Sequence, residues 1–400
     1  MNEIYLDNNA TTKVVPEILS VMTPFFIEHY GNASSTHLKG QVSARAIFES
    51  RNLILSTLKA NAHKVIFTSG GTESNNLAIL GVVLALKKNG STHSIGSGQA
   101  SLHQGGKHII TSSMEHSVVL ECMRVLEKKG YEISYVNPRE DGIIHAEDVT
   151  HAMRNETILV SIMNVNNETG AIFPVDKIAQ AVKTKNPMCI VHSDGVQAIG
   201  KIRPDLSQID LYSISGHKFH GPKGVGALIV REGTPLTSIM FGGGQEGGLR
   251  SGTENVPGIV GLAKALELSY ENFENKLENY RKLRDLLIQE LKPIENAIIN
   301  SPILSTAQTL NISFVGVSGE TLLNALSELG IYVGTGSACS EKKRGRSHVL
   351  TALGLRGERI NSSIRFSFSR YTTIEEIKKV SSVLCDLVPK LLNNEKPSQT

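Results

Sequence analysis

The chain has 400 residues, 40% of them hydrophobic, which is enough to bury a large core and to form two or three domain-sized units. Its formal net charge is only +3, so we expect neither a nucleic acid nor a membrane surface as a partner. The opening MNEIYLDNNA lacks the pattern of a secretion signal, and no apolar run approaches the roughly 18 residues that span a bilayer. These features predict a cytoplasmic protein.

The four cysteines lie far apart, at positions 122, 189, 339 and 385, and none forms a C-x-x-C pair. This spacing fits neither a disulfide framework nor a zinc site, so we expect a reducing compartment and no bound metal. Cys122, Cys189 and Cys385 stand in helix-like or strand-like contexts, and we interpret them as structural.

Residue periodicity and turn-forming residues predict elements in alternation along the first part of the chain. In order, they are a short strand from residue 5, helices at 15–29 and 41–58, a strand at 64–68, a helix from about 74, strands at 108–111 and 158–163, a helix at 178–185, a strand ending at residue 194, and two strands within 211–230. Strands that alternate with helices over 60–230 favour an α/β fold with a doubly wound, mostly parallel sheet. The Gly/Ser-rich segment 89–106 indicates a surface insertion.

The C-terminal part predicts a second, smaller α/β unit. A long helical segment at 258–291 carries leucines at helical spacing and leads into strands at 310–314 and 364–369 and helices at 320–329 and 374–391. We therefore expect a large domain at 13–260 and a small domain formed by 1–12 and 261–400. The small domain would also carry a Gly-rich loop at about 334–348.

A lysine lies in the turn between the two strands of LYSISGHKFHGPKGVGALIV (211–230). Lys218 stands between His217 and His220 at a strand end, where a partly desolvated amine loses its proton more easily and can form a Schiff base. Lysine is more often a solvated surface residue, so the turn alone leaves both interpretations open.

A carboxylate ends the preceding strand, in IVHSDGVQA (190–198). Asp194 is the residue type that pyridoxal phosphate (PLP) needs against its ring nitrogen, as Lys218 is the type that holds its aldehyde. A turn or helix cap is the commoner role of Asp in Ser-Asp-Gly. The two residues together favour a PLP site.

From these residues outward, nearly the whole chain resembles the class V, fold-type-I PLP enzymes, and among them the NifS/IscS-type cysteine desulfurases. The motifs that carry the resemblance are YLDNNATT (5–12), GNASSTH (31–37), TSGGTESNN (68–76), EHSVV (115–119), NNETG (166–170), HSDGVQAIGK (192–201), SGHKFHGPKG (215–224), RSGTENV (250–256), GSACS (336–340) and IRFSFSR (364–370).

The resemblance implies a role for each residue at a matching position. Those expected to hold the cofactor are Gly71, Thr72, Ser215, His217 and Thr253 at the phosphate, Asn167 and Gln197 at the ring oxygen, and His116 stacked on the ring beside Asp194 and Lys218. Thr253 would reach the cofactor of a neighbouring subunit, which implies a homodimer. His116 and Lys218 would move protons, and Arg365 would pair with the carboxylate of the substrate, L-cysteine, with Asn167 near it.

Cys339 aligns with the family's nucleophile. It lies in GTGSACS, next to the basic run EKKRGR (341–346), and nearby positive charge favours the reactive thiolate. The resemblance implies sulfur transfer from L-cysteine to Cys339 as a persulfide, with L-alanine as the other product. The length of this loop resembles that of the corresponding loop in the desulfurase subgroup that passes sulfur directly to protein acceptors such as iron–sulfur scaffolds. The basic run departs from many relatives and indicates an acidic partner surface.

Two alternatives remain open. The 89–106 insertion is similar to one in enzymes that resemble selenocysteine lyases, in which Cys339 would be dispensable. The other alternative is a non-catalytic scaffold that keeps the fold. The argument against it is the joint presence of Lys218, Asp194, His116 and Cys339.

Overall fold

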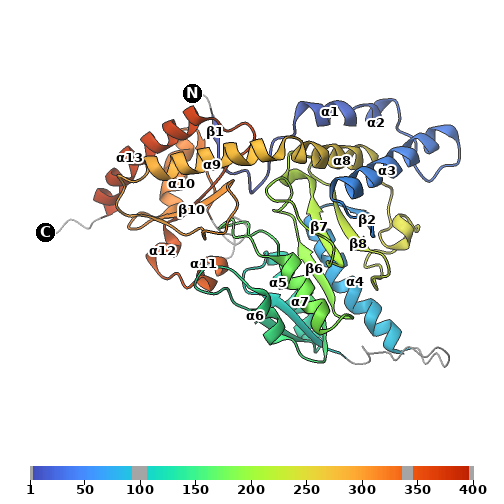
Figure 1. Ribbon diagram of the computed structural model, residues 1–400. Helices are drawn as coiled ribbons and strands as arrows, with labels where there is room; N and C mark the ends of the chain where they lie inside the picture. Colours follow the sequence, from blue (N-terminus) through green and yellow to red (C-terminus); the bar gives the residue numbers. More distant parts are fainter. Residues whose placement is uncertain (1–2, 92–105, 336–345, 396–400) are drawn as a thin grey trace.

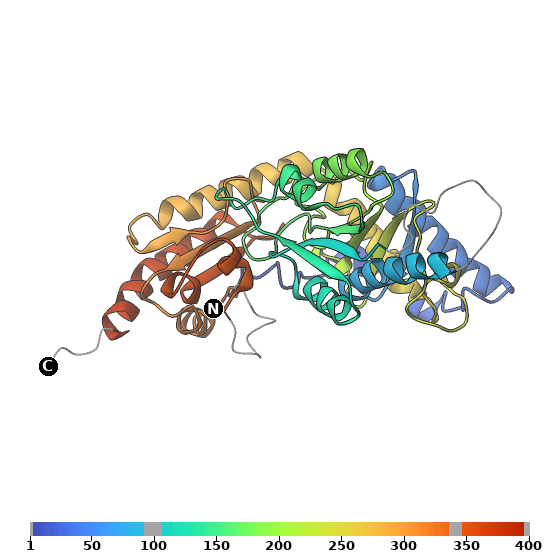
Figure 2. The same cartoon turned by 90° about the horizontal axis from the view of Figure 1, so that it is seen from below.

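The computed structural model describes residues 3–91, 106–335 and 346–395. It consists of a large lobe built on a seven-stranded sheet and a smaller lobe at one end of the molecule (Figures 1 and 2). Within the described ranges, no helix is long and apolar enough to cross a membrane.

The large sheet has the strand order β2-β8-β7-β6-β5-β3-β4. Its strands are β2 (His63–Thr68), β3 (His108–Ser112), β4 (Glu132–Val136), β5 (Thr157–Ser161), β6 (Ile190–Asp194), β7 (Leu211–Ser215) and β8 (Gly226–Arg231). β8 pairs antiparallel with both β2 and β7, and the other pairs are parallel. The expected mostly parallel sheet is confirmed, and β4, which the sequence interpretation missed, is a partly exposed edge strand.

Two hydrophobic clusters cover the two faces of this sheet. Alternate residues of a strand point to opposite faces, and in β2 Val65 and Phe67 join one cluster while Ile66 joins the other. The helices that supply the first cluster are α1 (Pro16–Met22), α3 (Leu38–Thr57), α6 (Ala146–Ala152), α7 (Val175–Lys185) and α8 (Val256–Tyr270). The second face is covered by α4 (Gly71–Ser91) and α5 (Ser117–Lys128). α4 includes the first three residues of the expected insertion at 89–106, and residues 92–105 lie outside the described part of the chain.

The small lobe has its own hydrophobic cluster, to which the start of the chain contributes Ile4 and Leu6. Its strands are β1 (Ile4–Tyr5), β9 (Ala297–Ile299), β10 (Thr309–Phe314), β11 (Ile331–Tyr332) and β12 (Ser363–Ser367); its helices are α9 (Phe273–Glu290), α10 (Gly319–Glu328), α12 (Glu358–Asn361) and α13 (Ile374–Glu395). The short helix α11 (His348–Ala352) packs on the core of the large lobe through Val349. β12, β10 and β9 form an antiparallel sheet, and β1 pairs with β11 in parallel.

Two of the expected helices are interrupted. The helix expected at 15–29 divides into α1 and α2 (Pro24–Ile27) at Thr23, because Pro24 has no N–H to continue the first helix. The segment expected to be helical over 258–291 divides into α8 and α9 at Asn272, whose φ of 50° is left-handed. The change from the core of the large lobe to that of the small lobe follows this break, within α9.

Candidate active site

A cavity of about 300 Å³ opens where β6 and β7 end, between the large sheet and the small lobe. The carboxyl ends of parallel strands are where α/β sheets bind ligands. The residues expected in the site that line this cavity are Gly71, Thr72, His116, Asn167, Asp194, Gln197, Ser215, His217, Lys218 and Arg365.

Lys218 reaches the cavity from the turn after β7. The strand ends at Ser215 and one 3₁₀ turn, Gly216–Lys218, follows. The Lys218 Nζ donates to the backbone oxygens of Asn9, at 2.7 Å, and Ala10, at 2.9 Å. The N-terminal segment therefore fixes the position of the amine.

Asp194 ends β6, the parallel neighbour of β7, and its side chain is 4% exposed. One carboxylate oxygen accepts a hydrogen bond from the Asn75 Nδ2 at 2.7 Å, and the other accepts from the Val196 N–H at 3.0 Å. Among the described residues, no Lys, Arg or His forms an ion pair with this carboxylate, although buried charges are normally paired. Asp194 is thus suited to a cationic group of a ligand in the cavity.

The start of α4 offers an anion site. Gly71 and Thr72 open this helix, whose first N–H groups have no partner within the helix and whose dipole favours negative charge. A Cβ at Gly71 would lie 2.7 Å from Val196 Cγ2, so the chain is too close there for a larger residue. Ser215 and His217 line the same cavity. Burial, and then Lys218 and Lys223, lower the pKa of His217 to about 4, so its ring is neutral at pH 7 and can donate one N–H.

His116 caps the start of α5. Its Nδ1 accepts a hydrogen bond from the Val118 N–H at 3.3 Å, so a neutral ring carries its proton on Nε2. Burial lowers the pKa of His116; Asp194 opposes this shift, and Lys218 and His348 add to it. The ring is therefore a neutral proton carrier near pH 7.

Arg365 enters the cavity from β12 of the small lobe. Its Nη2 pairs with Asp7 Oδ1 at 2.6 Å and its Nη1 donates to the Asn167 backbone oxygen at 3.0 Å. The buried Nε has no hydrogen-bond partner in the described structure. The guanidinium lines the cavity, and a fork of N–H donors suits a carboxylate ligand.

Several cavity residues were not expected from the sequence. Asn75 holds Asp194, and Asn9 contacts Lys218, Lys201 and Gln197. Glu168 accepts a hydrogen bond from Ser347 at 2.5 Å. Asn75, Asn9 and Glu168 stand in motifs quoted above, which was the available signal; His348 stands in none of them.

Two buried carboxyl groups lie at or beside the cavity. Burial raises the pKa of Glu168 to about 7, against the effects of its Ser347 hydrogen bond and of Arg365. Burial also raises the pKa of Glu115 to about 8, against its hydrogen bonds from Ser112 and the Met163 N–H. His348 Nε2 donates a hydrogen bond to the Glu115 backbone oxygen at 2.8 Å, so the start of α11 is tied to the residue that precedes His116.

Two expected site residues are not placed in the cavity. Thr253 is exposed and lines a separate hollow with Glu246 and Arg250. Cys339 lies outside the described residues, as do the basic residues of the run 341–346 except Arg346. Burial raises the pKa of Cys122 to about 11 and of Cys189 to about 12, so neither is a reactive thiolate. Cys385 is half-buried on α13, and its thiol contacts the Glu290 backbone oxygen.

Known proteins match this chain along nearly its whole length. A family model described as aminotransferase class-V matches residues 4–380. A cysteine desulfurase IscS of Dictyoglomus turgidum is 42% identical over 97% of this chain and 95% of that protein, and one of Methanosarcina thermophila is 41% identical over 98% and 93%. Among solved structures, a NifS-like protein matches with a TM-score of 0.87 at 37% identity, covering 98% of this chain and 100% of the other. SspA in complex with cysteine matches with a TM-score of 0.74 at 33% identity, covering 93% and 100%.

Proposed function

Because this chain belongs to the aminotransferase class-V family, and within it to the cysteine desulfurases of the NifS/IscS type, we propose that the 300 Å³ cavity is its active site and holds pyridoxal phosphate. The observation that carries the proposal is the placement of Lys218 and Asp194 on one cavity, at the ends of neighbouring strands. Asp194, buried without a basic partner among the described residues, fits the ring nitrogen. The start of α4 with Ser215 and His217 fits the phosphate.

The bound cofactor would supply an electron sink for the carbon that carries the substrate's amino group. Asp194 would keep the ring nitrogen protonated, with Asn75 holding the carboxylate in place. Gln197 and Asn167 would contact the ring oxygen. Lys218 would bind the cofactor and then hold or release the proton at the substrate's α-carbon.

The remaining residues would bind L-cysteine and take its sulfur. Arg365 would bind the substrate carboxylate through its guanidinium, which lines the cavity. His116 would carry a proton on Nε2. The Cys339 thiolate would attack the substrate sulfur: a sulfur–sulfur bond forms, the carbon–sulfur bond breaks with its electron pair left on carbon, and protonation there gives L-alanine. The product on the enzyme is a persulfide, which we propose is passed to a protein acceptor such as an iron–sulfur scaffold.

We also propose that the protein works as a homodimer in the cytoplasm. Thr253 does not line the cavity of its own chain, which fits a role in the partner's site. Large apolar side chains that are more than half exposed gather on α1 to α3 and their connections, where a second copy would cover them: Leu19, Phe26, Ile27, Tyr30, Leu38 and Phe48. We propose domains at 13–260 and at 1–12 with 261–400; the separate cores of the two lobes support two units, although α8 and Phe273 pack in the core of the large lobe, so that the change of core falls within α9.

Subunit mixing tests the shared site. Lys218→Ala and Thr253→Asp should each be nearly inactive, the second because a carboxylate would repel the partner's phosphate. After the two variants are mixed, about a quarter of the parent activity should return. Half of the dimers then contain one subunit of each variant, and each such dimer has one intact site and one site with both substitutions. Recovery of nothing, with mixed dimers present, would show that Thr253 acts elsewhere.

Product analysis tests the reaction. The purified protein, given L-cysteine and a thiol reductant, should release alanine and sulfide in equal amounts. Cys339→Ala should keep the absorption of the bound cofactor and lose both products. A Cys339→Ala variant that is fully active on L-cysteine would contradict the role of Cys339, and one active only on L-selenocysteine would favour a selenocysteine lyase.

A further inference from the structure

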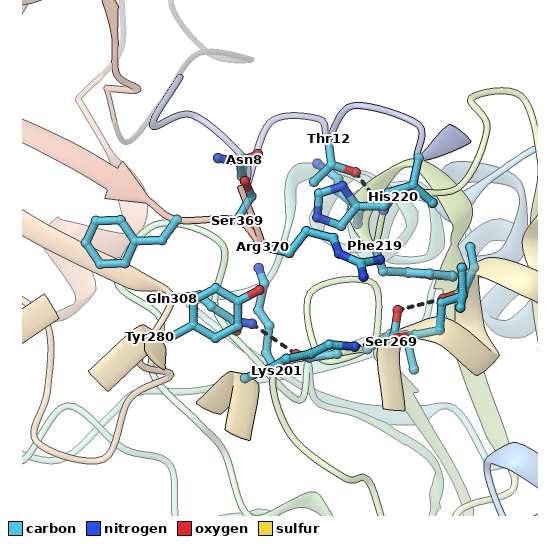
Figure 3. A pocket seen from close by; sticks show the side chains of 18 of the residues that line it. Asn8, Thr12, Lys201, Phe219, His220, Ser269, Tyr280, Gln308, Ser369 and Arg370 are labelled. Carbon is cyan, nitrogen blue, oxygen red and sulfur yellow. Dashed lines mark hydrogen bonds between the residues drawn. The ribbon is translucent and has the colours of Figure 1, made fainter. Parts of the chain in front are cut away.

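A second cavity, of about 50 Å³, shares Lys218 with the active site. Figure 3 shows it from close by. Lys218 lines both cavities, and with Asn9, Gln197 and Lys201 it forms a partition between them. The lining comes from the N-terminal segment, from the turns before α8, from α8 and α9, and from residues 368–370 of the small lobe. Both lobes thus contribute to its lining.

Its lining is cationic. Lys201, Lys218, Lys276 and Arg370 contribute basic side chains, and none of the described residues that line the cavity carries a carboxylate. His220 adds no charge, because burial lowers its pKa to about 4 and its Nδ1 bonds the Lys13 backbone oxygen at 2.8 Å. Buried charges of one sign without a counter-charge are costly.

The positive charge without a counter-charge is clearest at Lys201. Its side chain is 8% exposed, and its Nζ donates to Asn9 Oδ1 at 2.6 Å and to Gln197 Oε1. An ammonium group has three N–H donors, so these two bonds leave one unused, and Lys201 lines the smaller cavity. Burial, then Lys218 and Arg365, lower its pKa well below the ordinary value.

The opposite side of the cavity carries Arg370 and Lys276. Lys276 donates to the Leu268 backbone oxygen at 2.6 Å, and burial and Arg370 lower its pKa while Glu271, which does not line the cavity, raises it. The half-buried Arg370 guanidinium has neither a hydrogen bond nor an ion pair within the described structure. A planar fork of N–H donors matches two oxygens of one oxyanion.

We propose that this cavity binds one small oxyanion, of the size and charge of inorganic sulfate or phosphate, between Lys201, Lys276 and Arg370. A water needs roughly 10–15 Å³ of such space, so the cavity takes a few atoms and excludes a nucleotide or a peptide. The anion supplies the missing counter-charge and joins the two lobes. It also favours the charged form of Lys201, which is hydrogen-bonded through Asn9 to the backbone that holds Lys218.

This site is separate from the desulfurase reaction and does not depend on it. Sodium sulfate, titrated calorimetrically into the cofactor-loaded protein at constant ionic strength, should bind saturably with one site per chain. Arg370→Gln should weaken this binding at least ten-fold, and Lys276→Gln should weaken it less. The exposed Arg356→Gln is the matched control and should bind like the parent.

The melting temperature gives a second measurement. Sulfate raises the melting temperature of most proteins because it is excluded from their surfaces. Binding at one site is therefore measured by the part of the increase in melting temperature that saturates with sulfate concentration, after the increase in sodium chloride of equal ionic strength is subtracted. That part should be lost in Arg370→Gln and kept in Arg356→Gln. Absence of saturable binding to the parent, or equal binding by Arg370→Gln, would overturn the proposal. If Arg370→Gln does not fold, unchanged binding by Lys276→Gln would overturn it.

Discussion

The two cavities on either side of the partition share Lys218 and differ in their charges. The larger contains Asp194 and Glu168 as well as basic groups, and each of its charged side chains is held by specific hydrogen bonds. In the smaller cavity, the charged side chains among the described lining residues are all basic. The guanidinium of Arg370 has no hydrogen bond within the described structure. Charges of both signs at fixed positions can bind and move protons on a substrate, whereas charges of one sign can only attract a counter-ion.

The largest difference in activity is expected between substitutions of the two lysines of the partition, Lys218 and Lys201. Lys218→Gln should lower the rate of alanine formation by roughly 1,000-fold or more, because the amine that moves the proton is lost. Lys201→Gln should lower it only by about ten-fold, because Lys201 acts through the positions of Asn9 and Gln197. Steady-state rates and the bound-cofactor absorption measure both. Equal losses would mean that the partition acts as one unit.

A smaller loss is expected when the carboxylate of the larger cavity is neutralised. Asp194→Asn should lower kcat by roughly 100-fold, because an amide cannot keep the ring nitrogen protonated. Asn75→Ala should cost about ten-fold, because it removes one hydrogen bond to the carboxylate. The exposed Asp176→Asn is the control. Full activity of Asp194→Asn would contradict the assigned orientation of the cofactor.

Arg365→Lys tests the substrate clamp. The lysine keeps a positive charge next to Asp7 but loses the planar fork of N–H donors, so KM for L-cysteine should rise by about ten-fold with a smaller change in kcat. A change in kcat alone would mean that Arg365 positions the lobe and does not bind the substrate.

The smallest effect concerns stability and pH. The pKa of Glu115 is raised to about 8 in the folded protein from an ordinary value of 4.5. The folded state therefore keeps a proton that the unfolded state releases, and the contribution of this group is complete below pH 4.5 and is lost as the pH rises through about 8. Glu115→Gln should flatten the fall of the melting temperature between pH 7 and pH 8.

The matched control for this change is Glu140→Gln, at an exposed position. It should retain the slope of the parent. Because other groups titrate alike in all three proteins, the difference between variant and parent isolates Glu115. A parent-like slope for Glu115→Gln would show that this carboxyl is ionised in the folded protein.

The sequence predicts the strand-end residues of the site better than their partners. Lys218 and Asp194 follow buried apolar runs, and strand ends of a parallel sheet meet at one edge, so a shared location follows from local patterns. Asn75 contacts Asp194 across 119 positions of the chain, and His348 contacts Glu115 across 233. The first contact depends on how α4 packs against the sheet and the second on how α11 packs beside the start of α5, and no local pattern specifies either.

The differences in the fold have local causes. The edge strands β4 and β9 lack a continuous buried face, so they give a weak periodic signal. The break between α8 and α9 is invisible to apolar spacing, because leucines continue on both sides of Asn272. The cationic character of the smaller cavity also escapes the sequence, since Lys201, Lys276 and Arg370 lie in three separate segments.

Chemical trapping on the partition tests the central claim most directly. The cofactor-loaded protein is reduced with borohydride, which fixes the cofactor to its lysine, and digested for peptide mass mapping. We expect the pyridoxyl group on Lys218, with Lys201 unmodified. A pyridoxyl group on Lys201, or on neither lysine of the partition, would contradict the assignment of the larger cavity as the active site.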